Sequence, residues 1–180
     1  MDKHILLISY VFPPYPGIGS RRWAKFAKYL AGKGFKIHVI TTKNPFKEKS
    51  FWSDDIKHEN IDIHYIGRHY PKILILERKY LWQKIIARAL SYALKLLAKG
   101  ITYDFALFWK KSLHKEAVHL INKYKIKNVI TTGTPFRVPY YTALLKTKFP
   151  NLNIISDLRD NWLDGKLYCL NSISSKTLKY

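Results

Sequence analysis

The stretch 4–42, HILLISYVFPPYPGIGSRRWAKFAKYLAGKGFKIHVITT, decides the fold class of this chain. It begins with the continuous apolar run 4–10, which is typical of a β-strand covered on both faces. After a loop rich in proline and glycine, Ser20 is suited to cap a helix. The apolar residues of that helix recur at helical spacing on one face: Trp23, Phe26, Ala27 and Leu30. A second apolar run, 35–42, completes a strand–helix–strand unit, so we expect two parallel strands joined by a right-handed crossover.

The remainder of the chain continues to alternate between strand-like and helix-like segments. Short apolar or alternating runs predict three further strands: 61–66, 128–132 and 153–156. Helical spacing of apolar residues predicts three further helices: 72–99, 111–124 and 138–148. Strands that alternate with helices predict an α/β fold, an open parallel sheet with helices on both faces.

Composition and charge narrow the class of partner. The 180 residues include 32 Lys and Arg against 12 Asp and Glu, a formal net charge of +20. Such a balance favours an anionic partner, whether a membrane surface, a nucleic acid or a phosphorylated ligand, although a general lysine excess explains part of it. The single cysteine rules out an intrachain disulfide and fits a reducing compartment. No secretory signal, membrane-spanning run or Cys–His metal motif is recognisable.

A charged cluster follows the last predicted strand. The segment 156–162, SDLRDNW, places Asp157, Arg159, Asp160 and Trp162 directly after an apolar run. Charged side chains are costly to desolvate, so their concentration at the end of an apolar strand indicates a ligand cleft. A polar loop with an internal Arg–Asp pair accounts for the same residues equally well.

The loop after the first strand is a second candidate site. Gly17 and Gly19 lie where a helix begins and offers unpaired N–H groups to an anion, and Arg21 and Arg22 add positive charge. The loop is a poor dinucleotide fingerprint, because Arg22 occupies the third glycine position and the residues 41–43 include no acid for a ribose. A glycine turn without a ligand remains the alternative.

The segment 72–99 is basic and amphipathic. Its apolar residues recur at helical spacing, and basic residues lie between them: Arg78, Lys79, Lys84, Arg88, Lys95 and Lys99. With Trp82, this pattern suits a helix that lies in the headgroup region of an anionic membrane. An ordinary amphipathic helix, packed on the sheet with solvated lysines, would have the same pattern.

Together these segments resemble the N-terminal half of a GT-B glycosyltransferase of the family-4 type. The resemblance runs from about residue 4 to 164. It is carried by ILLISY at 5–10, FPP at 12–14, GIGSRR at 17–22, FAKYL at 26–30, GFKIHVIT at 34–41, VITTGTPF at 129–136 and DLRDNW at 157–162.

The resemblance implies a Rossmann-like, acceptor-binding domain at 1–165, with a basic helical insertion at 72–110. The tail 166–180 would begin a second, donor-binding domain. The implied activity is retaining, metal-independent hexosyl transfer from a nucleotide sugar, without a cofactor, to a cell-surface polysaccharide or lipid-linked acceptor. Many family members act on the inner face of the cell membrane, so the resemblance implies a cytoplasmic, peripheral protein.

The resemblance also assigns roles by position. The residues that would face the donor phosphates are Gly17, Gly19, Arg21 and Arg22. The acceptor would contact Thr134, Arg159 and Trp162, and catalysis would fall to Asp157 and Asp160. The residues that would bind the membrane are Arg78, Lys79, Trp82, Lys84, Arg88 and Lys95.

One departure from the family is large: the sequence ends at Tyr180, where the donor-binding half with its E-x7-E motif should begin. We therefore expect these residues alone to be catalytically incomplete unless a partner chain supplies that half. Two other classes stay open at this point. One is a basic nucleic-acid-binding α/β module, although no nucleic-acid motif is present. The other is a non-catalytic scaffold that keeps the fold.

Overall fold

A five-stranded parallel sheet forms the centre of the protein. The computed structural model describes residues 3–16, 18–44, 50–98 and 104–158. The strands are β1 (His4–Ile8), β2 (Lys36–Thr42), β3 (Ile61–Ile66), β4 (Asn128–Gly133) and β5 (Asn153–Leu158). They pair in parallel in the order β3-β2-β1-β4-β5. The α/β fold predicted from the sequence is therefore confirmed, and the strand order is Rossmann-like.

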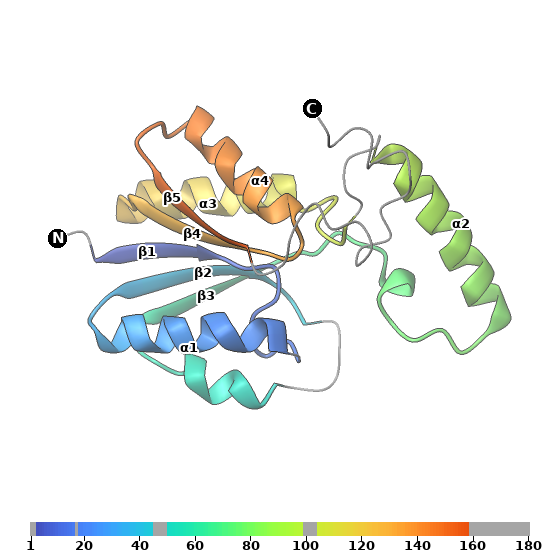
Figure 1. Ribbon diagram of the computed structural model, residues 1–180, viewed down its shortest axis with the longest axis horizontal. Helices are drawn as coiled ribbons and strands as arrows, with labels where there is room; N and C mark the ends of the chain where they lie inside the picture. The colour runs from blue at the N-terminus through green and yellow to red at the C-terminus, as the bar shows by residue number, and fades with distance from the viewer. Residues whose placement is uncertain (1–2, 17, 45–49, 99–103, 159–180) are drawn as a thin grey trace.

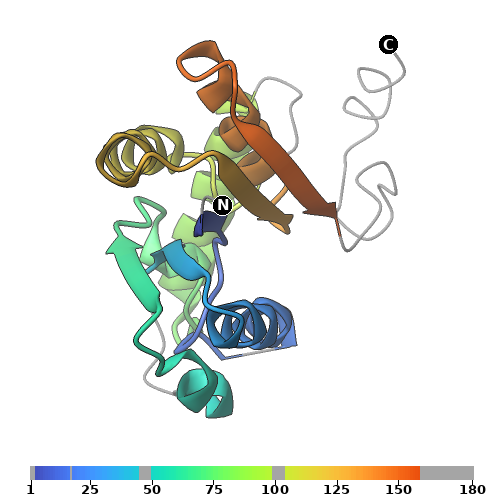
Figure 2. The same ribbon diagram turned by 90° about the vertical axis from the view of Figure 1, so that its left-hand side faces the viewer.

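Helices cover both faces of this sheet. They are α1 (Ile18–Gly32), α3 (Lys110–Tyr124) and α4 (Arg137–Ala143), with short 3-10 turns η1 (Phe51–Ile56) and η3 (Leu144–Thr147). Figures 1 and 2 show α1 and η1 on one face, and α3 and α4 on the other. The strand order accounts for this placement. From β1 the chain proceeds to β2 and β3 on one side of the sheet, whereas the connections to β4 and β5 run towards the other side. Right-handed crossovers in opposite directions put their helices on opposite faces.

The core has two parts because successive strand residues point to opposite faces. On β1, Leu6 and Ile8 join the cluster under α3 and α4, whereas Ile5 and Leu7 join the cluster under α1. Trp109 is fully buried in the first cluster, where its ring meets Tyr10 edge-on at a centroid distance of 5.1 Å. These side chains exclude water from both faces, as the continuous apolar run in β1 predicts.

The buried face of α1 agrees only in part with the predicted one. Its fully buried residues are small: Ser20, Ala24, Ala27 and Ala31. Of the predicted face, Ala27 is thus buried, and Trp23 and Leu30 are partly buried against the core. Small side chains let the helix lie close to the sheet, so the bulky Phe26 stays 46% exposed. The helix also begins at Ile18, two residues before Ser20, which lies inside it and donates a hydrogen bond from its hydroxyl to the Tyr15 carbonyl at 2.9 Å. The prediction that Ser20 caps the helix was therefore wrong.

The predicted helix 72–99 is interrupted. A 3-10 turn, η2 (Lys72–Leu74), is followed by a non-helical segment, and α2 (Leu81–Leu97) begins only after Tyr80. The Gln83 side chain fixes this start by accepting from the backbone N–H of Tyr80 at 3.2 Å. Figure 1 shows α2 standing apart from the sheet. Within α2 only Ala87 and Leu94 are buried, so the helix does not pack its apolar stripe on the sheet.

Candidate functional site

The carboxyl ends of all five strands meet at one edge of the sheet. Tyr10 follows β1, Thr42 ends β2, Arg68 follows β3, Thr134 follows β4 and Asp157 lies at the end of β5. Open parallel sheets bind ligands at this edge, because the loops there converge and expose polar groups. The polar residues that follow the strands therefore form the candidate functional site.

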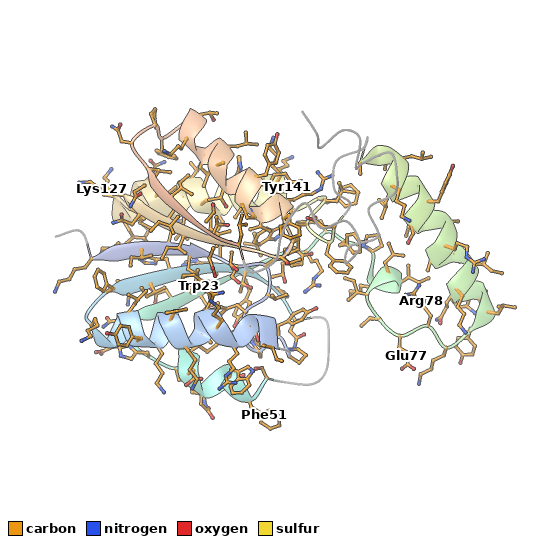
Figure 3. The ribbon with its side chains drawn as sticks, viewed as in Figure 1. Trp23, Phe51, Glu77, Arg78, Lys127 and Tyr141 are labelled. Atoms are coloured by element: carbon orange, nitrogen blue, oxygen red, sulfur yellow. The ribbon has the colours of Figure 1, made fainter. Side chains whose placement is uncertain are left out.

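The side chain of Asp157, in β5, forms hydrogen bonds with residues in the first turns of α1. Its Oδ1 accepts from Arg22 Nη2 at 2.9 Å, and its Oδ2 accepts from Trp23 Nε1 at 2.8 Å. The Asp157 side chain is 16% exposed and that of Arg22 is 45% exposed. Figure 3 shows Trp23 on the side of α1 that faces the sheet. The structure thus brings together two predicted site residues that lie 135 positions apart in the chain.

The two predicted arginines of α1 diverge. The guanidinium of Arg21 lies 4.5 Å from the ring centroid of Trp52 in η1, whereas Arg22 reaches β5. Gly19 lies in the first turn of α1. Four other predicted site residues fall outside the described residues: Gly17, Arg159, Asp160 and Trp162.

Donors from β3 and from the residues between β2 and η1 hold the loop between β1 and α1. The hydroxyl of Tyr65, in β3, donates to the Pro13 carbonyl at 3.0 Å. The Pro14 carbonyl accepts from Asn44 Nδ2 at 3.1 Å and from the Ser50 N–H at 3.0 Å. These bonds anchor the loop to the ends of β2 and β3, and so position the start of α1 against β5.

Arg68 is a site residue that sequence analysis missed. Its Nη2 donates to Thr42 Oγ1 at 3.0 Å and to the Lys43 carbonyl at 3.4 Å. The guanidinium lies over two rings, 5.1 Å from the centroid of Tyr10 and 5.3 Å from that of Tyr15. Cation–π contacts of this kind hold an arginine in place without cancelling its charge. Its position just after a predicted strand was the signal in the sequence.

A buried carboxylate and arginine form a second missed pair. Asp104 accepts from the backbone N–H groups of Ala106 and Arg137, each at 3.0 Å. The Arg137 Nε lies 3.8 Å from Asp104 Oδ1, and both side chains are nearly buried. Burial raises the pKa of Asp104 to about 6. The pair connects Asp104 to Arg137, the first residue of α4. Arg137 follows the half-buried Thr134 by three residues.

The predicted membrane-binding residues lie away from this edge. Arg78 and Lys79 belong to the segment before α2, and the other four are exposed on α2 itself: Trp82, Lys84, Arg88 and Lys95. Within the described ranges, no helix is long and apolar enough to cross a membrane. In the same part of the chain, no three His, Cys, Asp or Glu side chains are grouped so as to hold a metal ion.

Comparisons with known proteins give structural similarity but no match in sequence. No protein-family model and no curated protein matches the sequence. Among solved structures, the chain is similar to a UDP-glucose: anthocyanidin 3-O-glucosyltransferase in complex with UDP, with a TM-score of 0.49 and 14% identity. The match covers 93% of this chain and 32% of that chain, so this chain spans about a third of that protein's length. At this level the similarity assigns no function, and the fold assignment rests on the sheet itself.

Proposed function

We propose that these residues form the acceptor-binding side of a sugar-nucleotide-dependent glycosyltransferase of the GT-B type. The contact of Asp157 with Arg22 and Trp23 carries the proposal. It sets the start of the segment DLRDNW beside the helix that follows the glycine loop, at the edge where open parallel sheets bind ligands. These are two of the motifs that carry the resemblance to family-4 enzymes.

The charges at this edge suit an acceptor that carries phosphate. Three arginines gather there, Arg22, Arg68 and Arg137, against the carboxylates Asp104 and Asp157. Because the Arg22 side chain is 45% exposed, it has room to contact a diphosphate while it keeps its bond to Asp157. A guanidinium binds phosphate oxygens by two parallel hydrogen bonds, which orients the group as well as neutralising it.

The proposed reaction transfers a hexosyl group from a nucleotide sugar to an acceptor hydroxyl, with retention of configuration. Negative charge develops on the departing nucleotide diphosphate. In the proposed mechanism the positive end of α1 would stabilise this charge, so no metal ion is needed. Asp157 would accept a hydrogen bond from an acceptor hydroxyl and orient it.

A peripheral membrane role is the second part of the proposal. Large apolar side chains of α2 are exposed: Leu81, Trp82, Ile85, Ile86, Tyr92, Leu96 and Leu97. In water such a surface is unfavourable, and it is typical of a helix that lies in a membrane interface. A membrane-attached domain would meet a lipid-linked acceptor directly, which agrees with the phosphate-binding character of the sheet edge.

Acceptor binding can be measured on the 180-residue protein by calorimetric titration with a short-chain polyprenyl diphosphate monosaccharide. We expect saturable binding that Arg22→Gln weakens by at least about tenfold, since a charged hydrogen bond contributes ~1.5–3 kcal/mol. The matched control is Lys146→Gln, an exposed cation in η3, near the opposite edge of the sheet. Equal losses in both variants, or binding of RNA alone in a parallel filter assay, would contradict the proposal.

A further inference from the structure

A cleft of about 690 Å³ separates α2 from the segment that precedes it. Its polar lining consists of Glu77, Arg78, Lys84, Arg88 and Ser91. Figure 3 shows Glu77 and Arg78 on the segment that leads from η2 into α2. This volume lies within the range of about 300–1,000 Å³ that is usual for sites of small ligands. The cleft is separate from the carboxyl edge of the sheet.

Helical spacing explains why these residues share the cleft. Lys84, Arg88 and Ser91 stand at i, i+4 and i+7 along α2, which places them on one face of the helix. Arg78 reaches the same space from the segment opposite. Three cations and one carboxylate leave the cleft with a formal charge of +2.

The cations of this cleft are not neutralised by the protein. Among residues that the structure describes, none forms a salt bridge with Arg78, Lys84 or Arg88. Like charges in one concave space repel each other, and the field that they create attracts a counter-anion. The hydroxyl of Ser91 adds a neutral donor for an oxygen of that anion.

The cleft adjoins the exposed apolar face of α2. At 3.6 residues per turn, Lys84, Arg88 and Lys95 line one flank of this face, next to Leu81, while Trp82 and Leu96 lie near its centre. At the start of the helix, the rings of Tyr80 and Trp82 stack with a centroid distance of 6.4 Å, and both are more than half exposed. Exposed tyrosine and tryptophan are typical of the boundary between headgroups and acyl chains.

We infer that this cleft binds the phosphate group of an anionic lipid headgroup, while the apolar face of α2 enters the acyl region beside it. The inference rests on the proposed membrane role and adds a specific headgroup site to it. A nucleic acid fits the observations less well. Its phosphates would pair with the cations, but they would leave exposed side chains such as Leu81 and Ile85 in water.

The carboxylate of Glu77 offers a test of phosphate binding in the cleft. It lines the cleft with no ion-pair partner among the described residues, and it would repel a bound phosphate. Glu77→Gln should therefore tighten binding to phosphate-bearing membranes, by about two- to fivefold for one exposed charge at a membrane surface. Non-specific attraction to an anionic surface would give a gain of similar size, so this variant supports the site only together with the comparison that follows.

The deciding comparison is between Arg88→Gln and Lys95→Gln. Both variants remove one exposed positive charge from the same flank of α2, but only Arg88 lines the cleft. Co-sedimentation would use phosphatidylcholine vesicles, alone or with equal mole fractions of phosphatidic acid or phosphatidylglycerol. We expect Arg88→Gln to weaken binding by at least about tenfold. Lys95→Gln should weaken it by about fivefold or less, the contribution of one charge near the surface.

The other outcomes contradict the headgroup site, membrane attachment or both. Equal losses in the two variants would overturn the headgroup site but leave membrane attachment standing. Failure of the unmodified protein to bind any anionic vesicle would overturn both. Saturable binding of soluble glycerol 3-phosphate that leaves vesicle binding unchanged would assign the cleft to a free phosphate ligand instead of a lipid. RNA binding that is lost in Arg88→Gln but not in Lys95→Gln would assign the cleft to nucleic acid. Circular dichroism of each variant verifies that α2 is still folded.

Discussion

Replacing Asp157 with alanine should cost the protein about 2–4 kcal/mol of unfolding free energy. The charge pair with Arg22 contributes ~0.5–1 kcal/mol of this, because the Arg22 side chain is 45% exposed and solvent screens the pair. The hydrogen bond from Trp23 Nε1, 2.8 Å long and partly buried, contributes about 1.5–3 kcal/mol, since its acceptor is charged. Asp157→Asn keeps only a neutral acceptor for Trp23, so it should lose the ion pair and the charge-assisted part of the hydrogen bond, about 1.5–2.5 kcal/mol in total.

Urea unfolding followed by circular dichroism measures both variants against the unmodified protein. The matched control is Asp54→Ala, which removes an acid from an exposed pair with Lys57 in and after η1. This control should leave the unfolding free energy unchanged within error. If Asp157→Ala were as stable as the control, or if Asp157→Asn cost as much as Asp157→Ala, the assigned contacts between β5 and α1 would be wrong.

Three further changes test the electrostatics and packing behind the site. Burial lowers the pKa of His38 to about 4, so its neutral form contributes stability that is lost as pH falls from about 6.5 towards 4; His38→Gln should flatten that part of the stability profile. Burial raises the pKa of Asp104 to about 6, so the unmodified protein should lose stability relative to Asp104→Asn as pH rises from about 4 to 6. This slope is opposite in sign to that expected for His38, and urea unfolding at each pH measures both. Gly133→Ala would place a methyl group 3.3 Å from Leu158 Cδ2 and 3.4 Å from Phe136 Cδ1, and should cost about 1–3 kcal/mol in the same assay, part of which Leu158→Ala restores.

The sheet could be predicted because its strands are covered on both faces. Residues 5–8 are a continuous apolar run, and residues 37–42 are apolar or β-branched apart from His38; the helix between the two strands requires a parallel pair. The same topology predicted that the loop before Arg22 and the segment that begins at Asp157 lie at one edge of the sheet, because the carboxyl ends of parallel strands meet there. Periodicity and topology were therefore sufficient for the fold and for this common edge, but the contact between Arg22 and Asp157 appears only in the structure.

Details that depend on close packing were not predictable from periodicity. The apolar pattern favoured Trp23 and Phe26 as the buried face of α1, but the helix approaches the sheet so closely that alanines fill the contact. The break between η2 and α2 has no glycine or proline to mark it. Asp104 and Arg137 lie 33 positions apart and belong to no recognised motif, so only the folded chain reveals their pairing.

Tryptophan indole resonances offer the most direct test that acceptors bind at the carboxyl edge. In ¹⁵N-labelled protein, the Trp23 indole N–H reports on its bond to Asp157, and the Trp82 indole reports on the exposed face of α2. Addition of the short-chain polyprenyl diphosphate monosaccharide should shift the Trp23 resonance saturably, leave that of Trp82 in place, and have no such effect in Arg22→Gln. A shift of Trp82 alone, or of neither indole at saturating ligand, would contradict the proposed acceptor site.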